Sequence, residues 1–184
     1  ISMGLSIIPV LMIYSTLDLS NIVEYQAANG WLLLPVWGEG LSWQRWILLV
    51  PVAISFLIFL TSIFAEANRT PFDMSECETD LVGGYHTEYS SMKFGLFYMA
   101  EYAHLLLASF LVTLLFLGGW NGPLLPALVW FGIKLFAVFF VFIWVRATFP
   151  RIRYDQLMMF SWKVLTPLAF LNLLITAAFV VLQT

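Results

Sequence analysis

The stretch "FAEANRTPFDMSECETDLVGGYHTEYSSMKFGLFYMAEY", residues 64–102, joins two of the most apolar segments of the chain. It contains seven acidic residues, one cysteine and a Pro-Phe-Asp turn. Connections between membrane helices are usually shorter and less charged. The stretch therefore both separates two helices and contains the main candidates for functional side chains.

The composition around this stretch indicates that the solvent of the fold is lipid. Of the 184 residues, 61% are hydrophobic and 10% are charged, and the mean hydropathy is +0.91. Soluble domains contain about 25% charged residues, so a soluble fold of this length could not bury so much apolar surface. With no internal repeat or low-complexity linker, residues 1–184 are predicted to form one all-α integral membrane domain.

Hydropathy predicts about five transmembrane helices. Spanning about 30 Å of hydrocarbon takes roughly 20 apolar residues, and such segments are helical because unpaired backbone groups are too costly in lipid. The segments are Ile1–Leu17, Trp46–Ala65, Phe94–Leu117, Leu124–Val145 and Val164–Leu182. The first lacks the basic start and cleavage site of a signal peptide. It has the character of the end of a membrane helix, so we expect an upstream half.

Basic residues beside the helix ends predict the orientation. Six lie in or beside two loops on one side, whereas Arg45 alone lies on the other. The six are Arg69, Lys93, Arg146, Arg151, Arg153 and Lys163. Because Lys- and Arg-rich loops face the cytoplasm, the acidic loop over residues 66–93 is predicted to be cytoplasmic. On the other side, "DLSNIVEYQAANGW" predicts a short surface helix ending at Gly30, and "GGWNGPLLP" predicts a tight turn.

Three ionisable groups lie within or at the edge of the predicted spans. Glu101 is about two turns into its helix, His104 is one turn further on the same face, and Lys134 is near the middle of the next helix. A charge at mid-membrane costs at least about 2.5–3.5 kcal/mol, so such residues usually face a bundle interior and mark ion or proton paths. Two structural alternatives remain open: Glu101 pairs with Lys134, or Lys134 extends toward the interface.

A row of carboxylates leads toward the membrane. Glu66 ends one predicted span and Glu88 precedes the helix that contains Glu101. The thirteen residues from Glu88 to Glu101 correspond to about 20 Å if helical. If these groups are close in space, carboxylates bridged by waters would carry a proton from the loop into the membrane interior.

A second acidic group is formed by Asp73, Glu76, Glu78 and Asp80. The simplest interpretation is a solvated face. Its spacing matches no calcium-binding loop, so we expect no metal site. Cys77 is the only cysteine, which excludes an internal disulfide and a thiolate-built cluster or zinc site in this chain. Redox carriers, if the function needs them, are expected on other chains, and the charge and membrane burial exclude nucleic-acid binding.

The Arg-rich segment "VRATFPRIRYDQLMMFSWK" follows the fourth predicted span. Anchoring at the cytoplasmic interface accounts for part of this charge. Guanidinium groups at the lipid boundary, opposite an acidic loop, are also suited to line a cavity for a polar headgroup on a lipid-soluble tail. Trp31, Trp37, Trp43, Trp46 and Trp120 flank the spans, as aromatic residues at a membrane interface commonly do.

Four motifs resemble one family. "AEANRTPFD", "LVGGYHTEYSSMKFGLFYMAEY", "LFLGGW" and "VRATFPRIRYDQLM" are similar to the quinone-site membrane subunit of respiratory complex I, in its bacterial H-type form. The resemblance covers the whole chain and corresponds to the C-terminal half of the family. It implies a subunit of a proton-translocating NADH:ubiquinone or menaquinone reductase, with quinone as substrate. It also implies that NADH, FMN and the iron–sulfur clusters are bound by partner subunits, with no redox cofactor here.

The resemblance also implies roles for individual residues. Glu66, Glu88 and Glu101 match the family's proton path. The residues that match its quinone chamber are Arg69, Asp73, Tyr98, Arg146 and Arg151. The loop residues Glu76, Glu78 and Asp80 match the surface where the soluble arm docks. His104 and Lys134 are left as candidate intramembrane partners.

The implied partners are the soluble quinone-site subunits, the small membrane subunits, the antiporter-like subunits and lipid. The implied location is a bacterial inner membrane rather than that of an organelle. Two alternatives remain: the homologous subunit of a membrane-bound hydrogenase, formate hydrogenlyase or ferredoxin-linked complex, and a free-standing cation/proton antiporter. The second usually shows an inverted repeat, and none is found.

Overall fold

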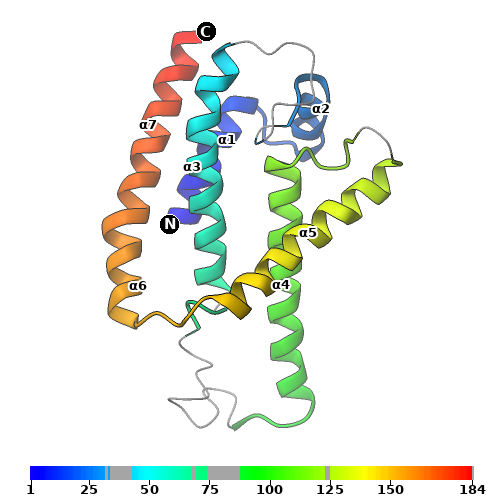
Figure 1. Cartoon of the computed structure of the whole chain (residues 1–184), viewed down its shortest axis with the longest axis vertical. Helices are drawn as coiled ribbons and strands as arrows, with labels where there is room; N and C mark the ends of the chain where they lie inside the picture. The colour runs from blue at the N-terminus through cyan, green and yellow to red at the C-terminus, as the bar shows by residue number, and fades with distance from the viewer. Residues whose placement is uncertain (32, 34–42, 68, 74–87, 123–124, 184) are drawn as a thin grey trace.

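The computed structural model describes residues 1–31, 33, 43–67, 69–73, 88–122 and 125–183 (Figure 1). Every regular element within these ranges is a helix. They are α1 (Ser2–Tyr14), α2 (Leu19–Asn29), α3 (Trp43–Glu66), α4 (Met92–Phe116), α5 (Ala127–Thr148), α6 (Tyr154–Phe160), the π-helical turn η2 (Ser161–Leu165) and α7 (Thr166–Gln183). The acidic loop of residues 66–93 lies mostly outside the described residues.

Four described stretches are long and apolar enough to cross a membrane, as an integral membrane protein requires. They are Ile47–Glu66, Met92–Phe116, Ala127–Thr148 and Tyr154–Leu182. The predicted N-terminal span differs from the structure, since α1 ends at Tyr14, where Ser15 takes a left-handed φ of 54°. Helices α1 and α2 are bent by 60° relative to each other and count as a fifth span only if they form one broken span.

The helical stretch that contains the predicted last span, Val164–Leu182, is longer than that span. It starts at Tyr154 and runs for 29 residues through α6, η2 and α7. The charge of Lys163 suggested that the helix begins after it, but Lys163 lies exposed within η2. A single cation on the exposed face of a helix does not interrupt it. The predicted short helix before Gly30 is confirmed as α2, whose first turn is capped by the Asp18 carboxylate accepting from the Ser20 N–H at 3.1 Å.

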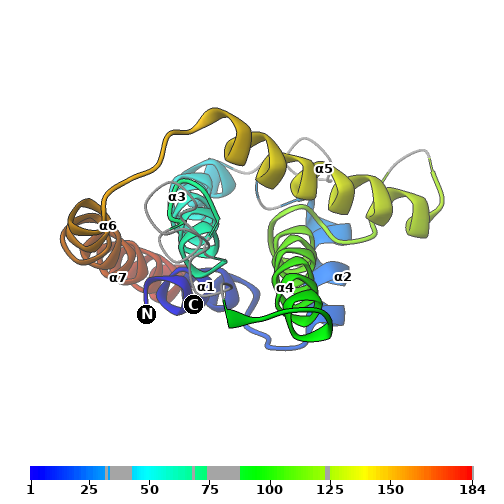
Figure 2. The ribbon, with the colours of Figure 1, turned by 90° about the horizontal axis from the view of Figure 1, so that it is seen from below.

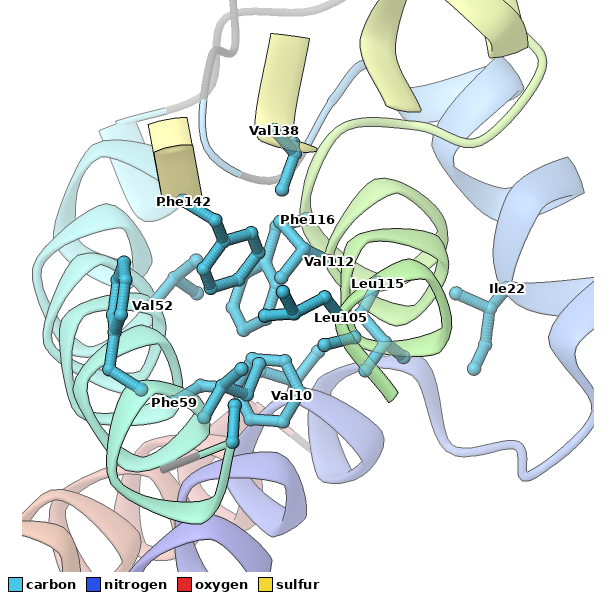
Figure 3. Packing of buried hydrophobic residues seen from close by; sticks show 14 of the residues in the cluster. Val10, Ile22, Val52, Phe59, Leu105, Val112, Leu115, Phe116, Val138 and Phe142 are labelled. Atoms are coloured by element: carbon cyan, nitrogen blue, oxygen red, sulfur yellow. The ribbon is translucent and has the colours of Figure 1, made fainter. Parts of the chain in front are cut away.

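The helices form two packed groups (Figures 1 and 2). Helix α3 contacts α1 and α7, which also contact each other, whereas α4 contacts α2 and α5. Helix α5 runs obliquely from the α2–α4 side toward the lower end of α3 (Figure 1). Buried apolar side chains between α3, α4 and α5 join the two groups, with Phe116 against Phe59 (Figure 3). The ring of Phe142 on α5 packs against that of Phe64 on α3.

Buried polar contacts add to the apolar packing of the first group. The Asn172 amide of α7 donates to the Pro51 carbonyl at 3.0 Å and to the Ser55 hydroxyl at 2.8 Å, both on α3. The hydroxyls of Ser2 on α1 and Ser62 on α3 are 3.0 Å apart. Interhelical hydrogen bonds and small residues are the usual means of helix association in lipid.

Side-chain hydrogen bonds from two other helices converge on the C-terminal end of α4. The Gln26 amide donates to the carbonyls of Leu114 and Leu115 at 2.9 and 3.2 Å, and the Tyr14 hydroxyl donates to Leu115 at 3.0 Å. The last carbonyls of a helix have no partner within the helix. Side chains from α1 and α2 therefore satisfy groups that would otherwise be unpaired in an apolar surrounding.

Gly119, which follows α4, should not tolerate a side chain. Its φ is +53°, and a Cβ there would lie 2.7 Å from Cγ2 of Val23 on α2. Gly119→Ala is expected to cost about 1–3 kcal/mol of stability, measured as a lower midpoint of thermal denaturation in detergent. Gly95→Ala is the control, because a Cβ at Gly95 meets nothing within 4 Å; equal losses in the two variants would contradict the steric explanation.

Candidate functional site

The segment of residues 69–73 connects α3 to two other parts of the chain. The Arg69 guanidinium, only 4% exposed, forms an ion pair with the Glu101 carboxylate on α4. Its Cζ also lies 5.1 Å from the centre of the Tyr102 ring, within the range of a cation–π contact. The buried cation is thus held by a carboxylate and an aromatic ring from the same turn of α4.

The other end of this segment contacts the connection between α5 and α6. Asp73 Oδ2 and Arg151 Nη2 are 3.5 Å apart. The Ile152 N–H donates to the Pro71 carbonyl at 3.0 Å, and the Phe72 N–H donates to the Arg69 carbonyl at 2.9 Å. One backbone hydrogen bond and two ion pairs therefore fix the segment between α4 and the α5–α6 connection, and a second backbone hydrogen bond closes a turn within the segment.

An apolar cavity of about 300 Å³ lies beside this segment. Its walls come from α3, the 69–73 segment, the end of α5 and α6. They include Leu60, Phe64, Phe72, Val145 and Leu157. Ligand sites of this kind combine apolar walls with a few polar groups, and here the segment that supplies Pro71 and Phe72 also contains Arg69 and Asp73 at its ends.

The residues predicted for the quinone chamber are only partly brought together. Asp73 and Arg151 form an ion pair, and Arg69 pairs separately with Glu101. All three are close in sequence to the wall residues Pro71, Phe72 and Ile152 but do not line the cavity themselves. Arg146 is exposed in the last turn of α5, next to the cavity residue Val145. Tyr98 lies on the first turns of α4 with its ring 4.8 Å from that of Phe94.

The residues predicted for the proton path differ in burial, and those predicted for docking are not described. Glu101 is partly buried by its pairing with Arg69, whereas Glu66 and Glu88 are exposed. Glu76, Glu78 and Asp80 lie outside the described residues, so their predicted role in docking remains a prediction. Within the described ranges no group of three His, Cys, Asp or Glu could hold a metal ion.

Lys134 does not form the ion pair with Glu101 that was one alternative. Its Nζ donates to the carbonyls of Leu117, Gly119 and Asn121, at 2.7, 3.0 and 2.7 Å. These carbonyls follow the C-terminus of α4, whereas Glu101 lies near its start, about 24 Å away at 1.5 Å per residue. Lys134 therefore caps the far end of the helix to which Glu101 belongs.

Comparison with known proteins shows the family of the chain. Residues 1–177 match a family model described as NADH dehydrogenase. The chain is 50% identical over 181 residues to the H subunit of the NADH-quinone oxidoreductase of Syntrophotalea carbinolica, covering 98% of this chain and 50% of the relative. It is 53% identical over 176 residues to the H 2 subunit of the same enzyme in Geobacter sulfurreducens, covering 96% and 48%.

The chain belongs to the NADH dehydrogenase family. It spans about half the length of the curated relatives it matches. The resemblance inferred from the four motifs is thereby confirmed at the level of the family.

Sequence reasoning misses two contacts of this family member. Nothing in the pattern singles out Tyr102, although its place directly after Glu101 puts it beside any cation that Glu101 binds. The sequence predicts Trp31 only as an aromatic at the interface, but Lys134 Nζ lies 4.0 Å from the centre of its ring. The position of Trp31 before α3 is the available sequence signal for an aromatic partner of Lys134.

Replacing Lys134 tests its role as a cap. Lys134→Met leaves three carbonyls without donors, and each unsatisfied buried acceptor costs about 1–3 kcal/mol. We expect a loss of at least about 3 kcal/mol, seen as reduced accumulation in membranes and a lower denaturation midpoint. Lys163→Met, at an exposed lysine, should behave as wild type; a stable Lys134→Met protein would show that the cap is dispensable.

Proposed function

We propose that this chain is the quinone-site membrane subunit of a proton-pumping NADH:quinone oxidoreductase, respiratory complex I. In this proposal the cavity beside residues 69–73 receives part of the quinone, and Glu101 belongs to the path that couples quinone reduction to proton movement. The observation that carries the proposal is the apolar cavity whose wall segment also contains Arg69 and Asp73.

The chemistry of a quinone fits such a site. Its isoprenoid tail is apolar and gains free energy by burial against side chains such as Phe64 and Leu157. Its headgroup has two carbonyl oxygens that accept hydrogen bonds and take up two protons and two electrons on reduction. Arg146 and Arg151, which directly adjoin the wall residues Val145 and Ile152 in sequence, are suitable donors because a guanidinium group presents several N–H groups.

The 69–73 segment provides a physical link between the cavity and the membrane interior. Pro71 and Phe72 form part of the cavity wall, and Arg69, two residues earlier, holds Glu101. A change in the charge or occupancy of the cavity would therefore act on the ion pair of Glu101. A buried charge left without its partner is costly, so we expect a displacement of Arg69 to act on Glu101.

The other components of the proposed complex are on partner chains. NADH oxidation, FMN and the iron–sulfur clusters belong to soluble subunits, with the soluble quinone-site subunits docking on the loop that contains Glu76, Glu78 and Asp80. Small membrane subunits and antiporter-like subunits flank the chain in the lipid. The proposed location is a bacterial inner membrane, with the acidic loop on the cytoplasmic side.

Narrowing the cavity tests whether quinone occupies it. Val145→Trp places an indole in the cavity wall. We expect the apparent KM for quinone to rise about tenfold, equivalent to about 1.4 kcal/mol of binding, with NADH oxidation by an artificial acceptor unchanged. Ile133→Trp is the matched control on the exposed face of the same helix. An unchanged quinone KM in Val145→Trp would remove the cavity from the proposal.

Neutralising Glu101 tests its role in coupling. Glu101→Gln should retain assembly and artificial-acceptor NADH oxidation, because the amide keeps the shape of the carboxyl group and its oxygen still accepts from the buried Arg69 guanidinium. Quinone-linked proton pumping should fall by about tenfold or more, since removing a positioned proton-transfer group typically costs even larger factors. Pumping is followed with a pH-sensitive dye in membrane vesicles, and wild-type pumping in this variant would exclude Glu101 from the path.

A further inference from the structure

Apart from the phenol of Tyr102, His104 is the next titratable residue after Glu101 along α4. Glu101 and His104 lie on the side of the helix that faces the bundle. Residues three apart are neighbours on a helix surface, with Cβ atoms about 5–6 Å apart. Leu105 and Ala108, which follow His104, are 5% and 2% exposed and pack in the same core cluster as Ile63 of α3. The imidazole is thus directed toward protein rather than lipid.

Nε2 of His104 is buried and forms no hydrogen bond within the described part of the chain. Leaving a buried polar nitrogen unsatisfied costs about 1–3 kcal/mol, and buried polar groups in folded proteins nearly always have a partner. A site next to a carboxyl group and an unpaired ring nitrogen has the polar partners that one buried water needs. One water could therefore join the Glu101 carboxyl group to Nε2 of His104.

We propose that His104 is the proton carrier that follows Glu101, accepting at Nε2 through a bridging water. This inference rests on the proposed function, because it extends the path of Glu101. The step conserves charge: the O–H bond of protonated Glu101 breaks, an N–H bond forms at Nε2, and the carboxylate is left paired with Arg69. Imidazole accepts and releases protons readily near neutral pH, and Arg69 stabilises the carboxylate while the proton is on the ring.

The remaining polar groups of α4 cannot take this role. Ser109 and Thr113 are buried, and their hydroxyls donate within the helix to the carbonyls of Leu105 and Ser109, each at 2.8 Å. No residue of α4 after His104 has a side chain that titrates near neutrality. The path along this helix therefore ends at His104, and a proton must leave α4 there.

The test uses the complete complex in membranes from the native host. His104→Gln and His104→Asn keep a polar side chain but cannot carry a proton, and Ser109→Ala is the control for loss of another buried polar group on the same helix. The measured quantity is the number of protons pumped per NADH oxidised by quinone, with artificial-acceptor NADH oxidation as the measure of assembled complex.

We expect both His104 variants to lower the protons pumped per NADH at least about twofold, with assembly intact and the control unchanged. A structural role would lower turnover and pumping together and leave their ratio unchanged, which would overturn the inference. Wild-type pumping in either assembled variant would overturn it as well, and so would failure of both variants to assemble while Ser109→Ala does.

Failure of the inference about His104 can be distinguished from failure of the proposed function. If Val145→Trp and Glu101→Gln alter quinone KM and pumping as expected but His104→Gln retains the full ratio, only the role of His104 is wrong. If those two variants have no effect, the proposed site is wrong, and a lowered ratio in the His104 variants would then have to arise from a path that excludes Glu101.

Discussion

The fold depends on how the backbone carbonyls at the end of α4 are satisfied. A helix that ends within an apolar surrounding has four carbonyls without intrahelical partners and a partial negative charge. Gln26, Tyr14 and Lys134 supply donors from α2, α1 and α5 to this one point. Three elements are therefore positioned by the end of a fourth, and the cationic donor also matches the sign of the helix dipole.

The two ends of α4 are held by cations in different ways. At its far end, Lys134 bonds to backbone and lies over the Trp31 ring. Near its start, Arg69 pairs with the Glu101 side chain. A contact to backbone carbonyls cannot be removed by protonation, whereas a contact to a carboxylate can. The same helix thus has one attachment whose acceptors do not titrate and one whose acceptor, a carboxylate, does.

Hydropathy and local chemistry were sufficient to predict several elements from the sequence. The long spans, the short helix that ends at Gly30 and the turn around Gly118 and Gly119 all arise from apolar runs and from residues that end helices. The partners of Lys134 and Arg69 could not be predicted, because they depend on how α4 packs against segments distant in sequence. Hydropathy places Lys134 within a span but does not identify its partners. These are backbone carbonyls, and every residue has one, so the residue types of the turn do not show that it binds a lysine.

The π-helical turn within the last span has a consequence for register. Such a turn inserts about one residue into the helical repeat, so the face that a helix presents shifts between α6 and α7. Before the turn, Leu157 and Phe160 line the cavity beside α3; from its last residue onward, Leu165, Ala169 and Asn172 pack along α3. In an uninterrupted α-helix the first pair would be rotated by about 100° relative to the later set. One extra residue thus lets a single span keep facing the same neighbour along its whole length.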